Sequence, residues 1–184
     1  MAEPSITELE AQIGELVEQL NRLRAASPRA EVPDYEFDTT DGVATLSSLF
    51  DGRDQLLVIH NMGEHCPYCT LWADGLNGQL AHLETALAVA LVSKDPPEQQ
   101  REFARSRGWG FRLASHGGGD YIREQTTLAG EDNMPGAVVY ERDGDTIYRK
   151  NSCTFGPGDL YCPTWHLLAL AGISEDDWVP ANAR

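Results

Sequence analysis

The segment that decides the fold of this chain is Gln55-Leu56-Leu57-Val58-Ile59-His60-Asn61-Met62-Gly63-Glu64-His65-Cys66-Pro67-Tyr68-Cys69. Its first six residues form an apolar run that is typical of a buried central strand in a parallel sheet. The residues from Thr70 to about Leu83 predict a helix, although Gly75 and Gly78 weaken that prediction. The two cysteines are therefore expected at a junction between a buried strand and a helix.

A pair of cysteines at such a junction has a specific chemical use. The unpaired N–H groups and the dipole at a helix N-terminus favour negative charge, so they lower the pKa of Cys66 and make it the attacking thiolate. Cys69 lies about one turn further along and is expected to be the resolving cysteine. Pro67 fits the first turn of the helix. The sequence thus predicts thiol–disulfide exchange at this pair.

Two other uses of the cysteines were weighed against exchange. The chain has four cysteines, and a zinc ion held by the first pair together with Cys153 and Cys162 is one alternative. Zinc sites usually have two short-spaced pairs, whereas eight residues separate Cys153 from Cys162. A structural, inert disulfide is the other alternative. The spacing favours the redox interpretation over both, and we expect no metal.

Beyond the junction, strands and helices alternate. The pattern predicts, in order, a strand over 86–92, a helix over 96–107, a strand over 111–115, a short helix over 120–127, a hairpin of 136–140 with 146–149, and a helix over 164–171. Asp143-Gly144 is a strong hairpin turn signal. Alternating elements that end in an antiparallel hairpin predict an α/β fold with a mixed central sheet.

The N-terminal part predicts a helix followed by a β-hairpin. Six apolar residues recur at spacings of three and four and form one seam: Ile6, Leu9, Ile13, Leu16, Leu20 and Leu23. Asp41-Gly42 predicts the turn of the hairpin. We therefore divide the chain into an amphipathic helix (1–30) and a main domain (31–184). The seam must be covered either by the chain's own domain or by a second copy in a homodimer, because periodicity does not identify the partner.

Several short strings together resemble the thioredoxin-like family known as domain of unknown function 899. They are Leu49–Leu56, Cys66-Pro67-Tyr68-Cys69, Trp72–Leu76, Val92–Pro97, Arg107–Phe111 and Ser115. The resemblance runs from about residue 10 to residue 165. It implies a thioredoxin-like fold and a dithiol–disulfide oxidoreductase role, for which the family supplies no established substrate.

The Met134-Pro135 dipeptide directly precedes the first strand of the C-terminal hairpin. Thioredoxin-like folds place a cis-proline at that point, opposite the active cysteines, and we expect the Met134–Pro135 bond to be cis. Met134, Pro135, Pro67 and Tyr68 are then expected to line the groove that receives the substrate. A disulfide or dithiol, in a protein or in a small thiol compound, is the expected partner.

Three further residues are candidates for supporting roles. A protonated His65 would stabilise the Cys66 thiolate, although an exposed histidine without a role is equally expected. Cys153 and Cys162 stand where the family pattern leads us to expect none. They are either auxiliary thiols that form a disulfide and exchange with the first pair, or two small, half-buried thiols, which we favour.

Peroxiredoxins also have a hairpin before the central strand, and they place threonine three residues before their reactive cysteine. Gly63 occupies that place for Cys66, so the sequence disfavours peroxide reduction. A weak thiol peroxidase activity remains an alternative. The other alternative is a non-catalytic, dimeric binding module that holds zinc or an inert disulfide.

The composition disfavours two classes of binding partner. Asp and Glu number 29 against 14 Lys and Arg, for a net charge of -15, which would repel nucleic acid and anionic membrane surfaces. No stretch approaches the roughly 20 apolar residues that span a bilayer. Residues 1–4 do not resemble a signal peptide, so a cytoplasmic location is expected. The glycine-rich stretch 117–119 lacks phosphate-loop spacing, and no cofactor is expected.

Overall fold

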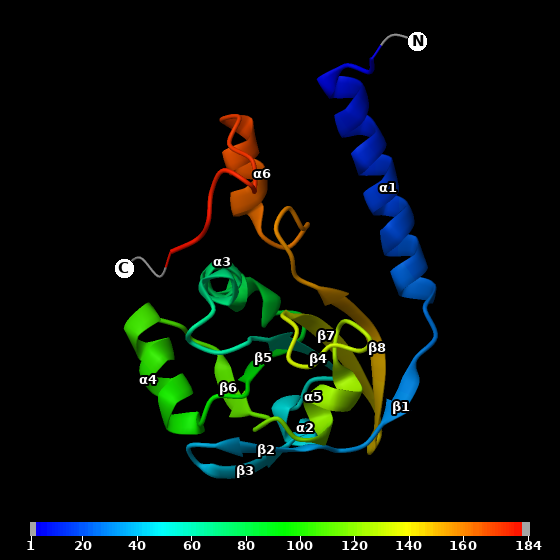
Figure 1. Ribbon diagram of the computed structural model, residues 1–184. Coiled ribbons are helices and arrows are strands. Elements are labelled where there is room, and N and C mark those ends of the chain that lie inside the picture. Colours follow the sequence, from blue (N-terminus) through cyan, green and yellow to red (C-terminus); the bar gives the residue numbers. More distant parts are fainter. Residues whose placement is uncertain (1–2, 182–184) are drawn as a thin grey trace.

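Figure 1 shows a computed structural model of the chain, which describes residues 3–181. Residues 1–2 and 182–184 lie outside the described part. The start of the predicted N-terminal segment (1–30), the end of the predicted main domain (31–184) and the first half of residues 1–4 therefore lie outside it too. Within residues 3–181, no helix is both long enough and apolar enough to cross a membrane.

A single mixed sheet of eight strands forms the centre of the molecule, in the order β1-β8-β7-β4-β5-β6-β2-β3. The strands are β1 (Ala30–Val32), β2 (Glu36–Thr39), β3 (Gly42–Thr45), β4 (Gln55–His60), β5 (Ala88–Ser93), β6 (Arg112–Ser115), β7 (Gly136–Asp143) and β8 (Thr146–Thr154). The pairs β4–β5 and β5–β6 are parallel, whereas the other neighbours are antiparallel. The predicted mixed sheet is confirmed.

Six helices flank or extend from the sheet. They are α1 (Ile6–Ala26), α2 (Leu46–Leu49), α3 (Pro67–Leu83), α4 (Pro97–Arg107), α5 (Asp120–Gln125) and α6 (Pro163–Leu170). In Figure 1, α3 and α4 lie on one side of the sheet, and α2 and α5 lie on the other. This arrangement, with the N-terminal helix and the β2–β3 hairpin added, confirms the predicted thioredoxin-like α/β fold.

The sheet has a hydrophobic core on each face because successive strand residues point to opposite sides. On one face, Val58 and Val92 pack with Tyr121 of α5, and all three are buried. On the other face, Ile59 and Leu91 pack with Trp72 of α3. The β4 strand is therefore buried on both sides, which explains its uninterrupted apolar run.

Some element boundaries differ from the predicted ones. The α3 helix begins at Pro67, three residues before Thr70, because proline is tolerated in the first turn and Cys66 caps the helix. The β7–β8 hairpin is longer than predicted. The β1 strand was not predicted, since its three residues are too few to show a pattern; it pairs with β8 at one edge of the sheet.

The α1 helix does not pack against its own domain along most of its length. It starts at the predicted cap, where Ser5 and Glu8 form a capping box, but none of its residues is buried. In Figure 1 it projects away from the body of the molecule. Its hydrogen bonds with the body lie near its C-terminal end, where the Arg24 guanidinium donates to the Tyr161 hydroxyl and the Arg24 carbonyl accepts from the Asn151 side chain. In this structure the chain's own domain therefore leaves most of the seam uncovered.

Candidate active site

The loop between β4 and α3 is held by side chains that flank the cysteine motif. The Asn61 amide oxygen accepts a hydrogen bond from the Gly63 N–H at 2.8 Å, and the Asp95 carboxylate accepts one from the Glu64 N–H at 2.8 Å. Gly63 has a φ of 113°, and a Cβ there would lie 2.6 Å from an Asp95 oxygen. The loop conformation therefore requires glycine at this position.

Cys66 occupies the N-cap of α3, as the sequence predicts. Its sulfur accepts a hydrogen bond from the Cys69 N–H at 3.1 Å, while its carbonyl accepts one from the Thr70 N–H at 3.1 Å. A hydrogen bond from the Cys69 thiol, together with those from the Cys69 and Tyr68 N–H groups, lowers the pKa of Cys66 to about 6, against the opposing effect of its partial burial. Cys66 is therefore largely a thiolate at neutral pH.

Cys69 has the opposite environment. Its side chain is buried, and its pKa is raised because its thiol donates to Cys66 and because burial disfavours its charged form. The Met62 N–H approaches its sulfur at 3.5 Å and favours the thiolate. The pair thus combines an accessible thiolate with a protected thiol. This is the arrangement required by the predicted roles of attacking and resolving cysteine.

His65 points into solvent beside Glu64. Its side chain is 91% exposed, and its Nε2 is 3.6 Å from a carboxylate oxygen of Glu64. The interactions that lower the pKa of Cys66 come from Cys69 and from backbone N–H groups, and His65 is not among them. Any influence of His65 on the thiolate stays a prediction.

Met134 and Pro135 lie at the same end of the sheet as the cysteine motif, because Gly136 pairs with His60 at the end of β4. The prediction of a cis bond is wrong: residues 3–181 contain no cis peptide bond, so Met134–Pro135 is trans. The trans form is intrinsically preferred even before proline. The Pro135 carbonyl is engaged by the Phe155 N–H at 2.9 Å, which joins this dipeptide to β8.

An aromatic cluster supports the N-terminal half of α3. The Tyr68 ring stacks on Trp165 of α6 with centroids 6.2 Å apart, and Trp72 stacks on Phe155 with centroids 5.5 Å apart. Trp72 is only 2% exposed, which confirms that it belongs to the core. The contact of Tyr68, inside the cysteine motif, with Trp165 has no local signal in the sequence, because the two residues are almost a hundred positions apart.

Cys153 and Cys162 lie in the core on the α3 side of the sheet. Cys162 is buried at the start of α6, and Cys153 is half-buried, with its pKa raised by burial. Among the described residues, no three or more His, Cys, Asp or Glu side chains are grouped so that they could hold a metal ion. The four cysteines therefore do not form a single cluster.

On the opposite face, a buried hydrogen-bond network that sequence analysis missed begins at His60, the last residue of β4. Its Nε2 lies 2.8 Å from the Tyr121 hydroxyl, which accepts a hydrogen bond from Tyr140 at 3.3 Å. Gln125 links Tyr140 to Tyr35. Burial, with smaller effects from the charges of His116 and Arg149, lowers the pKa of His60 to about 3. His60 is therefore uncharged at neutral pH.

Residues 4–180 match the model of a family described as "Bacterial protein of unknown function (DUF899)". The chain belongs to this family. Among curated proteins, none matches the sequence.

The solved structures similar to this DUF899 protein include peroxiredoxins. A cysteine-to-serine mutant of Xanthomonas campestris peroxiredoxin Q has a TM-score of 0.57 and 15% identity, over 75% of this chain and 89% of that one. A mutant of Xylella fastidiosa PrxQ has a TM-score of 0.58 and 14% identity, over 78% and 94%. Mycobacterium tuberculosis peroxidoxin BcpB has a TM-score of 0.53 and 19% identity, over 79% of this chain and 94% of that one. At these identities the similarity shows a shared fold.

Proposed function

We propose that this DUF899 protein is a dithiol–disulfide oxidoreductase in which Cys66 attacks and Cys69 resolves. The observation that carries the proposal is the hydrogen-bonded pair at the start of α3, with a pKa lowered to about 6 at Cys66 and a raised pKa at the buried Cys69. Such an opposed pair is what sequential attack requires, because only one of the two sulfurs should be nucleophilic at the outset.

The reaction has two steps. The Cys66 thiolate attacks one sulfur of a substrate disulfide, a new S–S bond forms, and the other substrate sulfur leaves as a thiolate that takes a proton from water. Cys69 then loses its proton to water and attacks the Cys66 sulfur. This forms the Cys66–Cys69 disulfide and releases the second substrate thiolate. The substrate gains two electrons and the pair loses two; an external dithiol or thiol returns them.

The first step itself prepares the second. While Cys66 is a thiolate, it accepts the Cys69 proton in a hydrogen bond and opposes a second negative charge nearby. In the mixed disulfide Cys66 carries no charge, so this opposition ends. The Met62 N–H then supports the Cys69 thiolate. Deprotonation of Cys69 is therefore delayed until the mixed disulfide exists.

The position of Met134, Pro135, Pro67 and Tyr68 supports a substrate groove at this end of the sheet. Pro67 and Tyr68 are half-buried next to Cys66 in the chain, and Met134 is half-buried two residues before the neighbouring β7. In our proposal an extended segment of a protein substrate, or a small disulfide, lies between these two pairs of residues.

The test is reduction of insulin disulfides with dithiothreitol or glutathione as the electron source. We expect Cys66→Ser to remove the activity. Cys153→Ser makes the same chemical change outside the pair and should retain it. Cys69→Ser should accumulate a mixed disulfide on Cys66 that mass spectrometry detects. Equal rates for Cys66→Ser and the parent chain would refute the proposal.

Thiol peroxidase activity is a second candidate, favoured by the fold shared with peroxiredoxins. Gly63, three residues before Cys66, is fixed against Asp95 and offers no hydroxyl group. We therefore expect slow peroxide consumption compared with insulin reduction by the same sample. A faster peroxide reaction that depends on Cys66 would reverse this order.

A further inference from the structure

Two apolar surfaces of this molecule have no cover. The first is one side of α1, where the exposed fractions of Ile6, Leu9, Ile13, Leu16 and Leu23 range from 44% to 77%. We call these five residues the α1 stripe. Helices in proteins gain most of their stability from packing of an apolar face, and the capping box at Ser5 supports only the first turn of α1. The stripe therefore needs an apolar partner.

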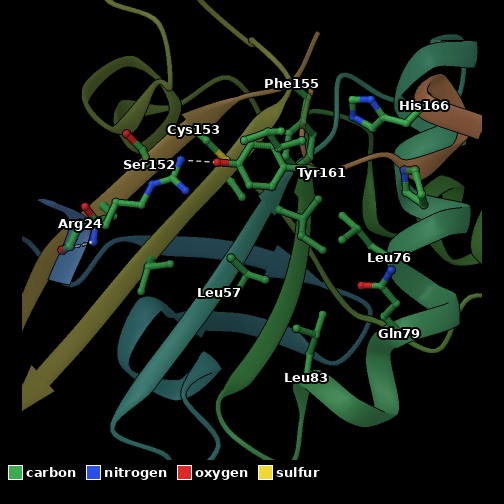
Figure 2. Close-up of a pocket in the computed structure, with 16 residues that line it drawn as sticks. Arg24, Leu57, Leu76, Gln79, Leu83, Ser152, Cys153, Phe155, Tyr161 and His166 are labelled. Atoms are coloured by element: carbon green, nitrogen blue, oxygen red, sulfur yellow. Dashed lines mark hydrogen bonds between the residues drawn. The ribbon is translucent and has the colours of Figure 1, made fainter. Parts of the chain in front are cut away.

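The second surface is a cavity of about 550 Å³ beside α3. It is distinct from the proposed substrate groove, and the word groove below refers to this cavity. Figure 2 shows it between α3, the face of β4, β7 and β8 that α3 leaves partly uncovered, and the segment that leads into α6. Its apolar walls include Leu57, Leu76, Leu83, Val139, Phe155 and Leu160. Neither Cys66 nor Cys69 lines it, so it is separate from the candidate active site.

Charge distinguishes the groove from the rest of the surface. The chain has 29 acidic residues, yet none lines the groove, whereas Arg24 lies at its edge. The α1 helix has the complementary character. Its acidic residues occupy its first four turns, and its basic residues lie near its end: Glu8, Glu10, Glu15 and Glu18, followed by Arg22 and Arg24.

We propose that the α1 stripe of one chain docks in the groove of a second copy, reciprocally, with the two α1 helices antiparallel about a two-fold axis. Arg24 belongs to both α1 and the groove, so each groove lies at the C-terminal end of its own α1. In an antiparallel pair the first turns of the partner's helix reach that end. Residues Ile6, Leu9 and Ile13 of α1 then enter the groove, and Leu16 lies near the axis.

Electrostatics select the antiparallel arrangement. It brings Glu8 and Glu10 of one helix opposite Arg24 and Arg22 of the other, with Glu15 and Glu18 near their copies beside the axis, whereas a parallel pair would place every glutamate beside its copy. In the antiparallel form, one register places Leu9 of one helix opposite Leu23 of the other, and Leu16 opposite Leu16. In that same register Glu10 lies opposite Arg22.

The contact area is large enough for a stable dimer. A helix of 21 residues is about 31 Å long and about 10 Å across, so half of its surface is roughly 500 Å². Each chain would bury its helix face and the surface that the partner's helix covers, for an upper bound of roughly 1,000 Å² per chain. Specific interfaces bury about 800 Å² per partner.

The test is the molar mass of the full chain in solution, measured by light scattering and sedimentation equilibrium over a range of concentrations. We expect twice the mass of one chain. The double variant Leu9→Glu/Leu16→Glu and the groove variant Leu160→Glu should each raise the dimer dissociation constant at least tenfold. Leu160 is 54% exposed, so its replacement should leave the fold intact. Val43→Glu is the matched control, since Val43 is 66% exposed on β3 and should not affect the dimer.

Orientation is tested by charge reversal. Glu10→Arg and Arg22→Glu should each weaken the dimer, and the two together in one chain should restore it, because the antiparallel contact is re-formed with opposite signs. A monomeric parent chain, including one that co-purifies with a small apolar molecule or a different protein in the groove, would overturn the proposal. So would a dimer that neither the stripe nor the groove variant weakens, or one that the double reversal leaves weak.

Discussion

The thiolate at Cys66 can be tested by replacing the neighbour that stabilises it. The largest cause of the lowered pKa is the hydrogen bond from the Cys69 thiol, and the backbone N–H groups of Cys69 and Tyr68 contribute less. Cys69→Ser keeps an O–H donor at this position, whereas Cys69→Ala removes it. Neither variant can form the Cys66–Cys69 disulfide, so in both Cys66 stays a free thiol as long as no substrate disulfide is present.

The expected magnitude follows from the pKa values. A thiol with a pKa of about 6 is about nine-tenths ionised at pH 7, whereas an ordinary cysteine with a pKa near 8.5 is only about 3% ionised. Because the thiolate is the nucleophile, the alkylation rate of Cys66 should rise with pH through a midpoint near 6 and then level off. In Cys69→Ala the midpoint should move upward by at least one pH unit. It should stay below the ordinary value, because the backbone donors remain.

The assay is iodoacetamide labelling at a series of pH values, with the modified residue identified by mass spectrometry. Cys153 does not interfere at low pH, since burial raises its pKa. Cys69→Ser should retain a midpoint near that of the reduced parent. The same midpoint in Cys69→Ser and Cys69→Ala would refute the assignment of the shift to the side-chain hydrogen bond. A midpoint above 8 in the parent would refute the lowered pKa itself.

Three further predictions concern stability, measured by urea unfolding. Gly63→Ala should lower the free energy of unfolding by about 1–3 kcal/mol, because its Cβ would meet the Asp95 carboxylate at a position with a positive φ. The control Gly14→Ala, in the exposed part of α1, should be neutral or slightly stabilising. Equal effects of the two substitutions would contradict this prediction. Tyr121→Phe should cost about 1–3 kcal/mol, because it leaves the buried His60 Nε2 without its partner; an unchanged urea midpoint would argue against the network. His60 has a folded-state pKa of about 3, below its value when unfolded, so its contribution is complete above about pH 6.5 and is lost at roughly 1 kcal/mol per pH unit as the pH falls toward 3. His60→Gln should reduce that slope by about one proton's worth, while His116, whose pKa burial also lowers to about 4, keeps its own contribution.

The junction between β4 and α3 was predictable because its signals are local. A run of apolar residues, a cysteine at the cap and proline in the first turn act within a few residues of one another. The β2–β3 and β7–β8 hairpins were predictable for the same reason, since Asp41-Gly42 and Asp143-Gly144 specify tight turns.

The surroundings of the cysteine pair could not be read in this way. Asp95 supports the loop from the end of β5, and Trp165 supports Tyr68 from α6, so both contacts depend on how distant segments meet. The trans bond at Met134–Pro135 shows a similar limit. A dipeptide before a strand is visible in the sequence, but the isomer depends on its neighbours and on the intrinsic preference for trans.

The α1 helix shows what periodicity can and cannot predict. The spacing of Ile6, Leu9, Ile13 and Leu16 specified a helix with one apolar side, and the helix is present. Periodicity carries no information on which surface covers that side. The cavity beside α3, unlike the substrate groove, was not predicted, because its walls come from α3, the central strands and the segment before α6.

The hydrogen bond between the two active-site sulfurs also bears on the direction of electron flow. It stabilises the Cys66 anion, which exists only in the reduced protein, so it lowers the free energy of the dithiol and leaves the disulfide unaffected. A stabilised dithiol corresponds to a less negative reduction potential. For the exchange proposed above, this contribution makes the oxidised pair a better electron acceptor, and the reduced pair a weaker donor, than the same pair without the hydrogen bond.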